Sequence, residues 1–308
     1  MASVSVSDRT MVYGRAGFVT DEAKTAAEAI EAAGLDWTVS LRQTFFDGDG
    51  EGTMSPVRNK LAVVRDDTHE ALGVVGTRYT PFQNVETFAF ADQLAAQGGL
   101  FESAFTQCHG SVVGLTMRFP DGVMIGGEDP VEKYLILRSK HDGSGCLIGG
   151  IGMLRMGCLN QFDSTLNRSA SQIRLPHTHS LERQAAQAAA VLELSYEAAD
   201  TFVADAEQML ALKMTDKQVD ALIESVLKEQ ALSDAARGKT KEAITDSWKN
   251  TPTIPDSYRK TGWGVLNGIG EYFDWVFPYR NEQSRLASTI DGRGAHAKKV
   301  AQRLLLNR

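Results

Sequence analysis

The sequence is short of cysteine, of long apolar runs and of positive charge. Its three cysteines, Cys108, Cys146 and Cys158, include no C-x-x-C pair, so the pattern indicates neither a disulfide framework nor a closed zinc site. No stretch approaches the ~20 apolar residues that a membrane-spanning helix requires. The first residues also lack the continuous apolar core of a secretion signal. We therefore expect a cytoplasmic protein that makes no contact with a membrane.

The net charge of −7 taken alone argues against a nucleic-acid partner. The charge is unevenly distributed, however. Residues 1–137 have 10 basic and 19 acidic side chains and residues 184–236 have 3 and 10, whereas 138–183 carry a net +3 and 280–308 a net +5. Because a phosphate backbone is bound by the local field, two basic segments keep nucleic-acid binding open. Solvated faces produce the same asymmetry, so the pattern permits such binding without requiring it.

The segment 134–160 is typical of a β-hairpin with polar side chains at its turn. Residues 134–139 alternate with the period of a strand, and Asp142-Gly143 tolerates the positive φ of a tight turn. Guanidinium and amide groups on such strands suit phosphates, although an ordinary solvated turn also favours Asp and Gly. The candidate nucleic-acid-binding residues in and after this hairpin are Arg138, Lys140, His141, Arg155, Asn160, Arg168 and Arg174. Because the hairpin can bring Arg138 and Arg155 together, we expect these two and Arg174 to lie within one basic surface.

Predicted strands dominate the first half of the chain and predicted helices the second. The strand patterns cover 35–41, 60–65, 71–75, 100–105, 111–119 and 123–125, with a turn at 120–122 and a loop at 45–56. Helices are expected from Thr20 or Asp21 to Gly34, at 84–97, 161–168, 181–212, 215–227, 263–277 and 295–306, with a break at 237–262. This order predicts an α+β fold with a β-hairpin-rich antiparallel sheet and a packed helix in the N-terminal half, followed by a mainly helical C-terminal half. We expect an α+β core over residues 1–180 and a helical region over 181–308 packed on it.

Several motifs suggest a metal or a nucleotide but are incomplete. Asp47, Asp49 and Glu51 resemble the start of a calcium loop, but the rest of the twelve-residue ligand pattern with its final Glu is absent. Gly238-Lys239-Thr240 lacks the earlier glycine and the preceding strand of a Walker site. His177 and His179 follow Pro176 and lie just before a predicted helix start, which favours a loop over a metal site. We therefore expect no metal and no cofactor.

The C-terminal half offers a second basic segment, made of Arg293, Lys298, Lys299 and Arg303. Aromatic residues near it could stack on bases, as in single-strand binders. Trp263, Tyr272 and Phe273 recur on an apolar helical face, however, which favours burial in the core. We expect the basic tail from Arg293 to be the mobile or functional part.

A series of short sequence pieces runs through nearly the whole chain: Gly34–Trp37, Ala62–Arg65, Leu72–Gly76 with Tyr79 and Gln83-Asn84, His141–Ser144, Arg155 with Cys158 and Asn160, Ile173-Arg174, His177-Thr178, and Thr261–Lys298 with Leu266-Asn267, Glu271-Tyr272 and Asp274. In these pieces the chain resembles a family of phage- and plasmid-like proteins classed as a domain of unknown function, DUF932. Two other pieces depart from the family pattern, at Tyr13–Gly17 and at Asn160–Phe162. The resemblance implies no established activity.

A second resemblance is one of architecture. A helix packed on a hairpin-rich sheet and followed by helices is similar to phage annealing proteins of the Rad52-like class, which line a basic groove with single-stranded DNA in an oligomeric ring. Together these features lead us to expect a homo-oligomeric, non-enzymatic protein that binds single-stranded DNA in recombination or replication. Two alternatives remain open: an enzyme using His141, Asp142, Arg155 and Cys158 on a small or phosphorylated substrate, and a scaffold for other phage proteins.

Overall fold

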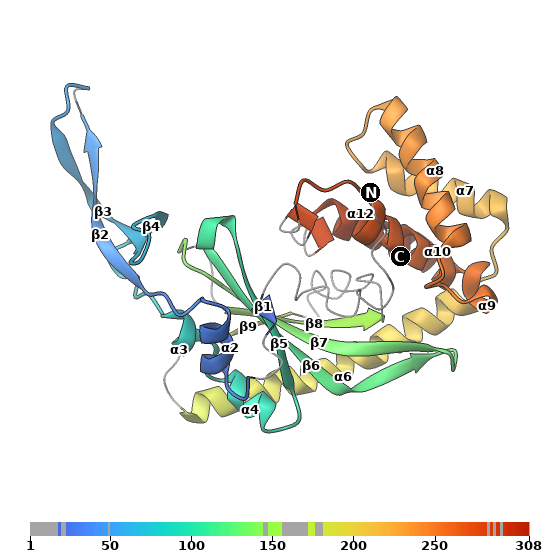
Figure 1. Cartoon of the computed structure of the whole chain (residues 1–308), viewed down its shortest axis with the longest axis horizontal. Helices are drawn as coiled ribbons and strands as arrows, with labels where there is room; N and C mark the ends of the chain where they lie inside the picture. Colours follow the sequence, from blue (N-terminus) through green and yellow to red (C-terminus); the bar gives the residue numbers. More distant parts are fainter. Residues whose placement is uncertain are drawn as a thin grey trace.

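Two antiparallel sheets form the N-terminal half of the molecule, and helices form most of the rest (Figure 1). The computed structural model describes residues 18–19, 23–48, 50–143, 147–155, 172–175, 181–281, 284–285, 288–289 and 292–307. The larger sheet has the order β1-β5-β6-β7-β8-β9 and the smaller one β2-β3-β4. The strands are β1 (Phe18–Val19), β2 (Val39–Asp47), β3 (Met54–Arg65), β4 (Ala71–Gly76), β5 (Leu100–Gln107), β6 (Val112–Ile125), β7 (Asp129–Lys140), β8 (Leu147–Arg155) and β9 (Gln172–Leu175). The predicted α+β class is confirmed.

The helices follow in two groups. In the described part of the chain, the short helices α2 (Ala26–Ala32), α3 (Asn84–Phe88) and α4 (Ala91–Ala95) and a 3-10 turn (Cys108–Gly110) lie among the strands. After the sheets come α6 (Leu181–Ala211), α7 (Asp216–Lys228), α8 (Asp234–Asn250), α9 (Asp256–Arg259), α10 (Gly262–Glu271), a π-helical turn (Tyr272–Val276) and α12 (Arg293–Leu305). The expected break at 237–262 was wrong in part, because Gly238, Lys239 and Thr240 lie inside α8.

Local chemistry explains the ends of several elements. Thr25, rather than Thr20 or Asp21, is the N-cap of α2, and Gly34 follows that helix with a φ of 65°. Thr215, at the start of the helix predicted at 215–227, caps α7 through a reciprocal pair of bonds with Gln218. Pro120–Gly122 is a bulge inside β6 instead of a turn, because the register with β7 shifts between Phe119 and Val123.

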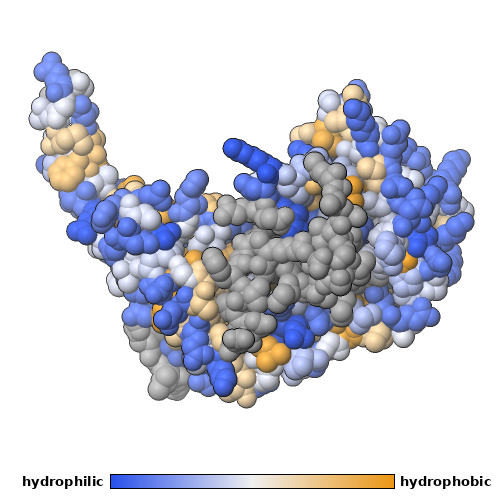
Figure 2. Space-filling model, viewed as in Figure 1, coloured by the Kyte–Doolittle hydropathy of each residue, from blue (hydrophilic) through white to orange (hydrophobic). Residues whose placement is uncertain are grey.

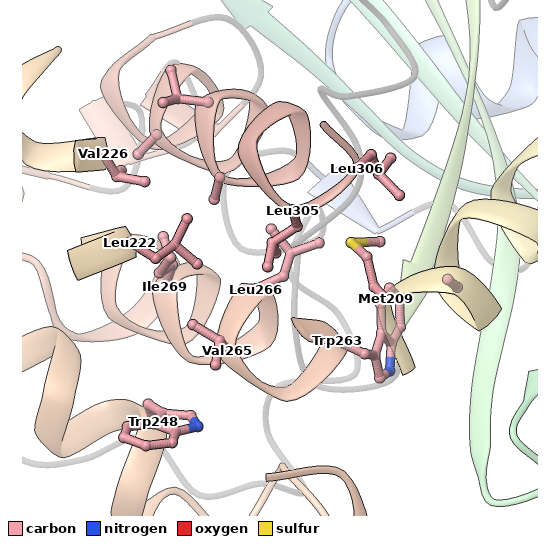
Figure 3. Close-up of a cluster of buried hydrophobic side chains, with 14 of the residues drawn as sticks. Met209, Leu222, Val226, Trp248, Trp263, Val265, Leu266, Ile269, Leu305 and Leu306 are labelled. Atoms are coloured by element: carbon pink, nitrogen blue, oxygen red, sulfur yellow. The ribbon is translucent and has the colours of Figure 1, made fainter. Parts of the chain in front are cut away.

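The long helix α6 connects two hydrophobic clusters. Its first half, through Ala188 and Val191, packs with residues of the six-stranded sheet such as Leu115 and Leu135. Its second half, including Met209, belongs to a cluster made by the C-terminal helices. Figure 3 shows side chains of α6, α7, α8, α10 and α12 converging there.

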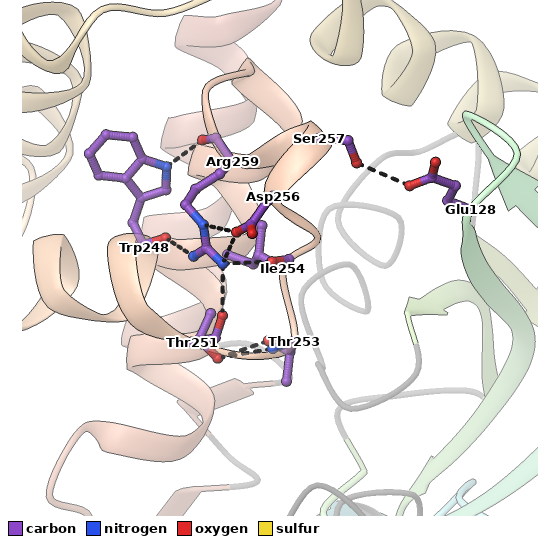
Figure 4. Close-up of polar contacts among 8 residues, drawn as sticks. All are labelled: Glu128, Trp248, Thr251, Thr253, Ile254, Asp256, Ser257 and Arg259. Carbon is purple, nitrogen blue, oxygen red and sulfur yellow. Dashed lines mark hydrogen bonds and ion pairs between the residues drawn. The ribbon is translucent and has the colours of Figure 1, made fainter.

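The end of the β6–β7 hairpin reaches into the helical cluster. Ile125 and Val131 are buried there, and Trp263 Nε1 donates to Asp129 Oδ2 at 2.9 Å. On the neighbouring α9, Ser257 donates to Glu128 at 3.0 Å (Figure 4). Sheet and helices are therefore joined by both apolar and polar contacts.

The Arg259 side chain, from α9, caps the C-terminus of α8. Its guanidinium donates to the carbonyl oxygens of Trp248 and Thr251, which lie at that C-terminus, and also to that of Ile254 (Figure 4). The carbonyl groups of a last helical turn lack a hydrogen-bond donor inside the helix and carry partial negative charge. A guanidinium supplies both the donors and the positive charge.

The β2–β3 hairpin projects from the body of the molecule (Figure 1). β4 pairs with β3 only as far as Lys60, so beyond this point the hairpin has two strands. At the same point the register jumps from the pair Gln43–Leu61 to the pair Phe45–Pro56, which leaves a bulge in β3. The Gln43 amide donates to carbonyls at both ends of the bulge, those of Val57 and Lys60. We call residues 44–57 the arm end.

Candidate nucleic-acid interface

The turn after β7 packs against β4 and joins the two sheets. Gly73 of β4 lies so close to Asp142 that a Cβ on it would stand 2.5 Å from the Asp142 Cα atom. Gly143, with a φ of 76°, lies equally close to the Val75 side chain. Only glycine permits both approaches, because any side chain would overlap the opposite chain.

His141 is the buried centre of this junction. Its side chain is 2% exposed, and its Nε2 atom lies 2.7 Å from Asn84 Oδ1. The Asn84 amide nitrogen donates to the carbonyls of Leu35 and Trp37, so its oxygen must face the histidine. An amide oxygen only accepts, and therefore Nε2 of His141 carries the proton.

This geometry corrects the assignment of His141 to a nucleic-acid surface. A side chain enclosed by Trp37, whose ring centroid lies 5.5 Å away, and by Asn84 presents almost no surface to a phosphate. The protonated Nε2 has no lone pair for a metal or for proton abstraction, which leaves only Nδ1 of this buried ring for such a role. His141 is a structural residue that ties α3 to the hairpin turn.

A cation-lined hollow of about 950 Å³ opens beside the same turn. Its described lining contains Lys60 and Arg78 but no Asp or Glu. The remaining lining residues are Asn59, Val74, Val75, Gly76, Thr77, Tyr79 and Gly143. Lys60 and Arg78 are both exposed, and among the described residues neither forms an ion pair with a carboxylate. We call this site the cationic hollow.

Tyr79 provides an aromatic wall to the cationic hollow. Burial, and secondly the negative charge of Asp142, raise the pKa of its phenol. Tyr79 therefore stays protonated at neutral pH and can donate a hydrogen bond. Its half-buried ring packs partly against the hydrophobic core and partly lines the hollow.

The sheet register brings some of the predicted cations together. Arg138 of β7 and Arg174 of β9 both pair with Ile148 of β8, so they stand in one row on the same face. Lys140 is two residues beyond Arg138 and shares that face. Arg174 is exposed, and the other two are half-buried. Lys140 is also three residues from Gly143 at the cationic hollow.

Arg155 is not part of this row. It pairs with Val131, seven residues along β7 from Arg138, which is roughly 23 Å at the rise of a strand. The expectation that the hairpin brings Arg138 and Arg155 together was wrong, because the turn sets Ile148 opposite Arg138. Asn160, Arg168, Cys158, His177, His179 and the helix expected at 161–168 lie outside the described residues.

The second basic segment is dispersed. Lys298 is 1% exposed, and its Nζ donates to the buried Asp274 at 2.9 Å, so it cannot belong to a basic surface. Arg303 is paired with Glu229. Arg293 and Lys299 are exposed. The expected mobile tail was also wrong, since Ala297, Val300 and Leu305 of α12 are buried in the helical core.

The aromatic residues of α10 and the following turn are core residues. Trp263 and Phe273 are completely buried and Tyr272 is 5% exposed, as the apolar face predicted. Trp275 is half-buried and packs its ring against the guanidinium of Arg285 at 4.8 Å. A base could not reach the three buried rings without unfolding the region.

No metal site is found in the part of the chain that the structure describes, where no three His, Cys, Asp or Glu side chains gather suitably. Asp47, from the calcium-like sequence, accepts hydrogen bonds from the backbone N–H groups of Gly50 and Gly52. Its carboxylate therefore organises the arm loop.

Sequence reasoning missed the residues of the cationic hollow. Lys60 and Arg78 are 18 positions apart, and the pairing of Lys60 with Gly76 brings them together. The available signal was a cation at the outer end of each strand of a predicted hairpin, with Lys60 at the start of 60–65 and Arg78 three residues after 71–75, next to Tyr79. Isolated exposed cations are common on protein surfaces, so this signal is weak without the fold.

Residues 71–290 match the family model described as Domain of unknown function (DUF932). This match covers most of the chain, and the protein belongs to that family. Searches of curated proteins and of solved structures found no match, so the likeness to annealing proteins stays a prediction. Among the described helices, none is long and apolar enough to cross a lipid bilayer.

Proposed function

We propose that this DUF932 protein binds single-stranded nucleic acid at the cationic hollow and along the Arg138–Arg174 row. The observation that carries the proposal is the pairing of two exposed cations, Lys60 and Arg78, in a hollow with no carboxylate in its described lining. Two fixed positive charges in a concave surface favour a phosphate-bearing ligand, even on a protein whose net charge is −7.

The composition of the hollow favours unpaired bases. Single-strand binders combine cations for the backbone with aromatic rings on which bases stack, and here Tyr79 stands next to Arg78. The Asn59 amide and the Thr77 hydroxyl offer hydrogen bonds to sugar or base edges. A volume of about 950 Å³ matches small-molecule sites of roughly 300–1,000 Å³, so a nucleotide has room.

The strand path continues from the hollow to the sheet in this proposal. Along the chain, Lys140 lies between Arg138 and Gly143 of the hollow, and Arg138 and Arg174 share one face of the sheet. We further propose that the ligand is DNA and that binding takes place in the cytoplasm, during recombination or replication of a phage, plasmid or related element. The support for this setting is the resemblance to phage- and plasmid-like proteins.

Fluorescence anisotropy with a labelled single-stranded oligonucleotide tests the proposal. Arg78→Glu should weaken binding by more than about tenfold, which is 1.4 kcal/mol, while Lys239→Glu on the exposed face of α8 should leave it within about twofold. The duplex of the same sequence should bind more weakly than the single strand. Equal effects of the two substitutions, or no binding by the unaltered protein, would contradict the proposal.

A further inference from the structure

The arm end carries negative charge, whereas the cationic hollow carries positive charge. Residues 44–57 contain Asp47, Asp49 and Glu51 and no Lys or Arg. Figure 2 shows a hydrophobic band on the projecting hairpin below a hydrophilic end. The large apolar side chains are exposed: Phe45 by 49%, Phe46 by 52% and Met54 by 58%.

Among the residues that the structure describes, none covers these side chains of the two-stranded hairpin. Isolated hairpins are marginally stable, and clustered exposed apolar groups mark interaction sites. Phe45 pairs with Pro56 and Asp47 with Met54, so Phe45, Met54 and Pro56 share one face. Phe46 lies towards the other face, with its ring against Gly48. The arm end is therefore apolar on both sides.

Charge decides the kind of partner. Three carboxylates and no cation repel a phosphate backbone, so nucleic acid is a poor occupant for the arm end. A fitting surface is positively charged and contains apolar groups. The cationic hollow has both, since Lys60 and Arg78 stand beside Val74, which is 53% exposed, and beside Tyr79.

The arm end cannot reach the hollow of its own chain. Both lie on one hydrogen-bonded ladder, with Lys60 at the base and Met54 six residues further out. Six residues of strand span roughly 20 Å, and folding back would break the β2–β3 pairs. The occupant must be the arm of another copy.

We propose that the arm end of one copy docks in the cationic hollow of the next copy. This contact joins two different surfaces, so each copy retains one free arm and one free hollow. Such head-to-tail contacts generate rings or filaments and not closed dimers. The hollow is the one that we propose for nucleic acid, but the self-association does not require nucleic acid. Where both occur, arm and nucleic acid compete for Arg78.

Complementation between two variants tests the arrangement in the absence of nucleic acid, by sedimentation velocity. Phe45→Ser with Phe46→Ser removes the arm contact, and Arg78→Glu removes the hollow contact. Each variant alone should be monomeric where the unaltered chain forms species larger than dimers. An equimolar mixture should form a one-to-one dimer and stop there, because one intact arm meets one intact hollow. Lys239→Glu should associate like the unaltered chain.

Other outcomes overturn the inference. Association of Arg78→Glu by itself would place the arm on another surface, such as a second arm, and a monomeric unaltered chain would remove the contact altogether. The arm variant should bind single-stranded oligonucleotide at least as tightly as the unaltered chain; a loss of more than about tenfold would make the arm end a nucleic-acid element. If the unaltered chain does not bind nucleic acid but the two variants still form the one-to-one dimer, the proposed nucleic-acid binding is contradicted and the arm contact is supported.

Discussion

His141 and Asn84 are joined by a hydrogen bond of 2.7 Å inside the junction of the two sheets. The bond fixes the turn that follows β7, and this turn carries Gly143 to the edge of the cationic hollow. The polar residue His141 at the hairpin tip thus supports the cationic hollow by fixing the turn and not by contacting a ligand. His141 holds the turn in place, Gly143 two residues later lines the hollow, and Lys140 just before His141 shares the face of Arg138.

Asn84→Ala should destabilise the protein by about 3 kcal/mol, because it leaves two carbonyls and the His141 N–H without their partner and each orphaned buried group costs about 1–3 kcal/mol. Urea unfolding followed by circular dichroism measures the loss. Gln93→Ala, at an exposed position on α4, is the control and should change stability by less than about 0.5 kcal/mol. A neutral Asn84→Ala would show that the junction does not depend on this network.

The adjacent lysines of α12 should behave very differently. Lys298→Ala leaves the buried Asp274 without its ammonium partner and should cost about 3–5 kcal/mol. Lys299→Ala, one position further on an exposed face, should stay within about 0.5 kcal/mol. Thermal and urea unfolding of the two variants in the same buffer make the comparison. Similar losses for both would argue against a buried ion pair.

The penalty of Lys298→Met should depend on pH. Burial raises the pKa of Asp274, with Lys298 acting in the opposite direction. The folded state thus binds this proton more tightly than the unfolded state, so the cost of a charged Asp274 is present above its folded pKa and is relieved as pH falls towards about 3.9. Removing the ammonium raises the pKa further.

The stability deficit of Lys298→Met relative to the unaltered protein should therefore narrow as the pH falls from 8 to 5. Urea unfolding at the two pH values gives this difference, and Lys299→Met should show no such change. A deficit that is constant or that widens on acidification would be inconsistent with a raised pKa for Asp274.

Phe273→Ala should destabilise the protein by about 3–5 kcal/mol, because the side chain is fully buried and its removal leaves a cavity. Val276→Ala on the same segment, 49% exposed, should cost less than about 1 kcal/mol. At a temperature where both variants remain folded, oligonucleotide affinity should be unchanged. A stable Phe273→Ala variant with a large binding loss would make this segment a stacking platform.

Much of the fold could be predicted because its signals are local. The period of two in 134–139, the Thr215 cap and the apolar spacing around Phe273 each determine an element within a few residues of sequence. The bulges at 57–60 and 120–122 were missed because they depend on the pairing of a partner strand. The helical state of Gly238 within α8 likewise results from packing that overrides a weak local preference.

The site was harder to predict, since it depends on register. Local sequence suggested that Arg138 and Arg155 meet across a hairpin, but their separation follows from which residue faces which. Two further residues were misassigned because they are buried. The sequence alone does not show whether a histidine or a lysine faces water or a partner inside the protein. Only the packing of α3 and α12 reveals that His141 and Lys298 face inwards.

The salt dependence of single-strand binding tests the central claim most directly. Each phosphate contact contributes about 0.7 to the slope of log K against log salt, so replacing Lys60 and Arg78 together by alanine should reduce the slope by about 1.4, while Lys239→Ala should leave it unchanged. An unchanged slope in the Lys60→Ala, Arg78→Ala variant would contradict the account, because it would show that the nucleic-acid backbone does not pass through the cationic hollow.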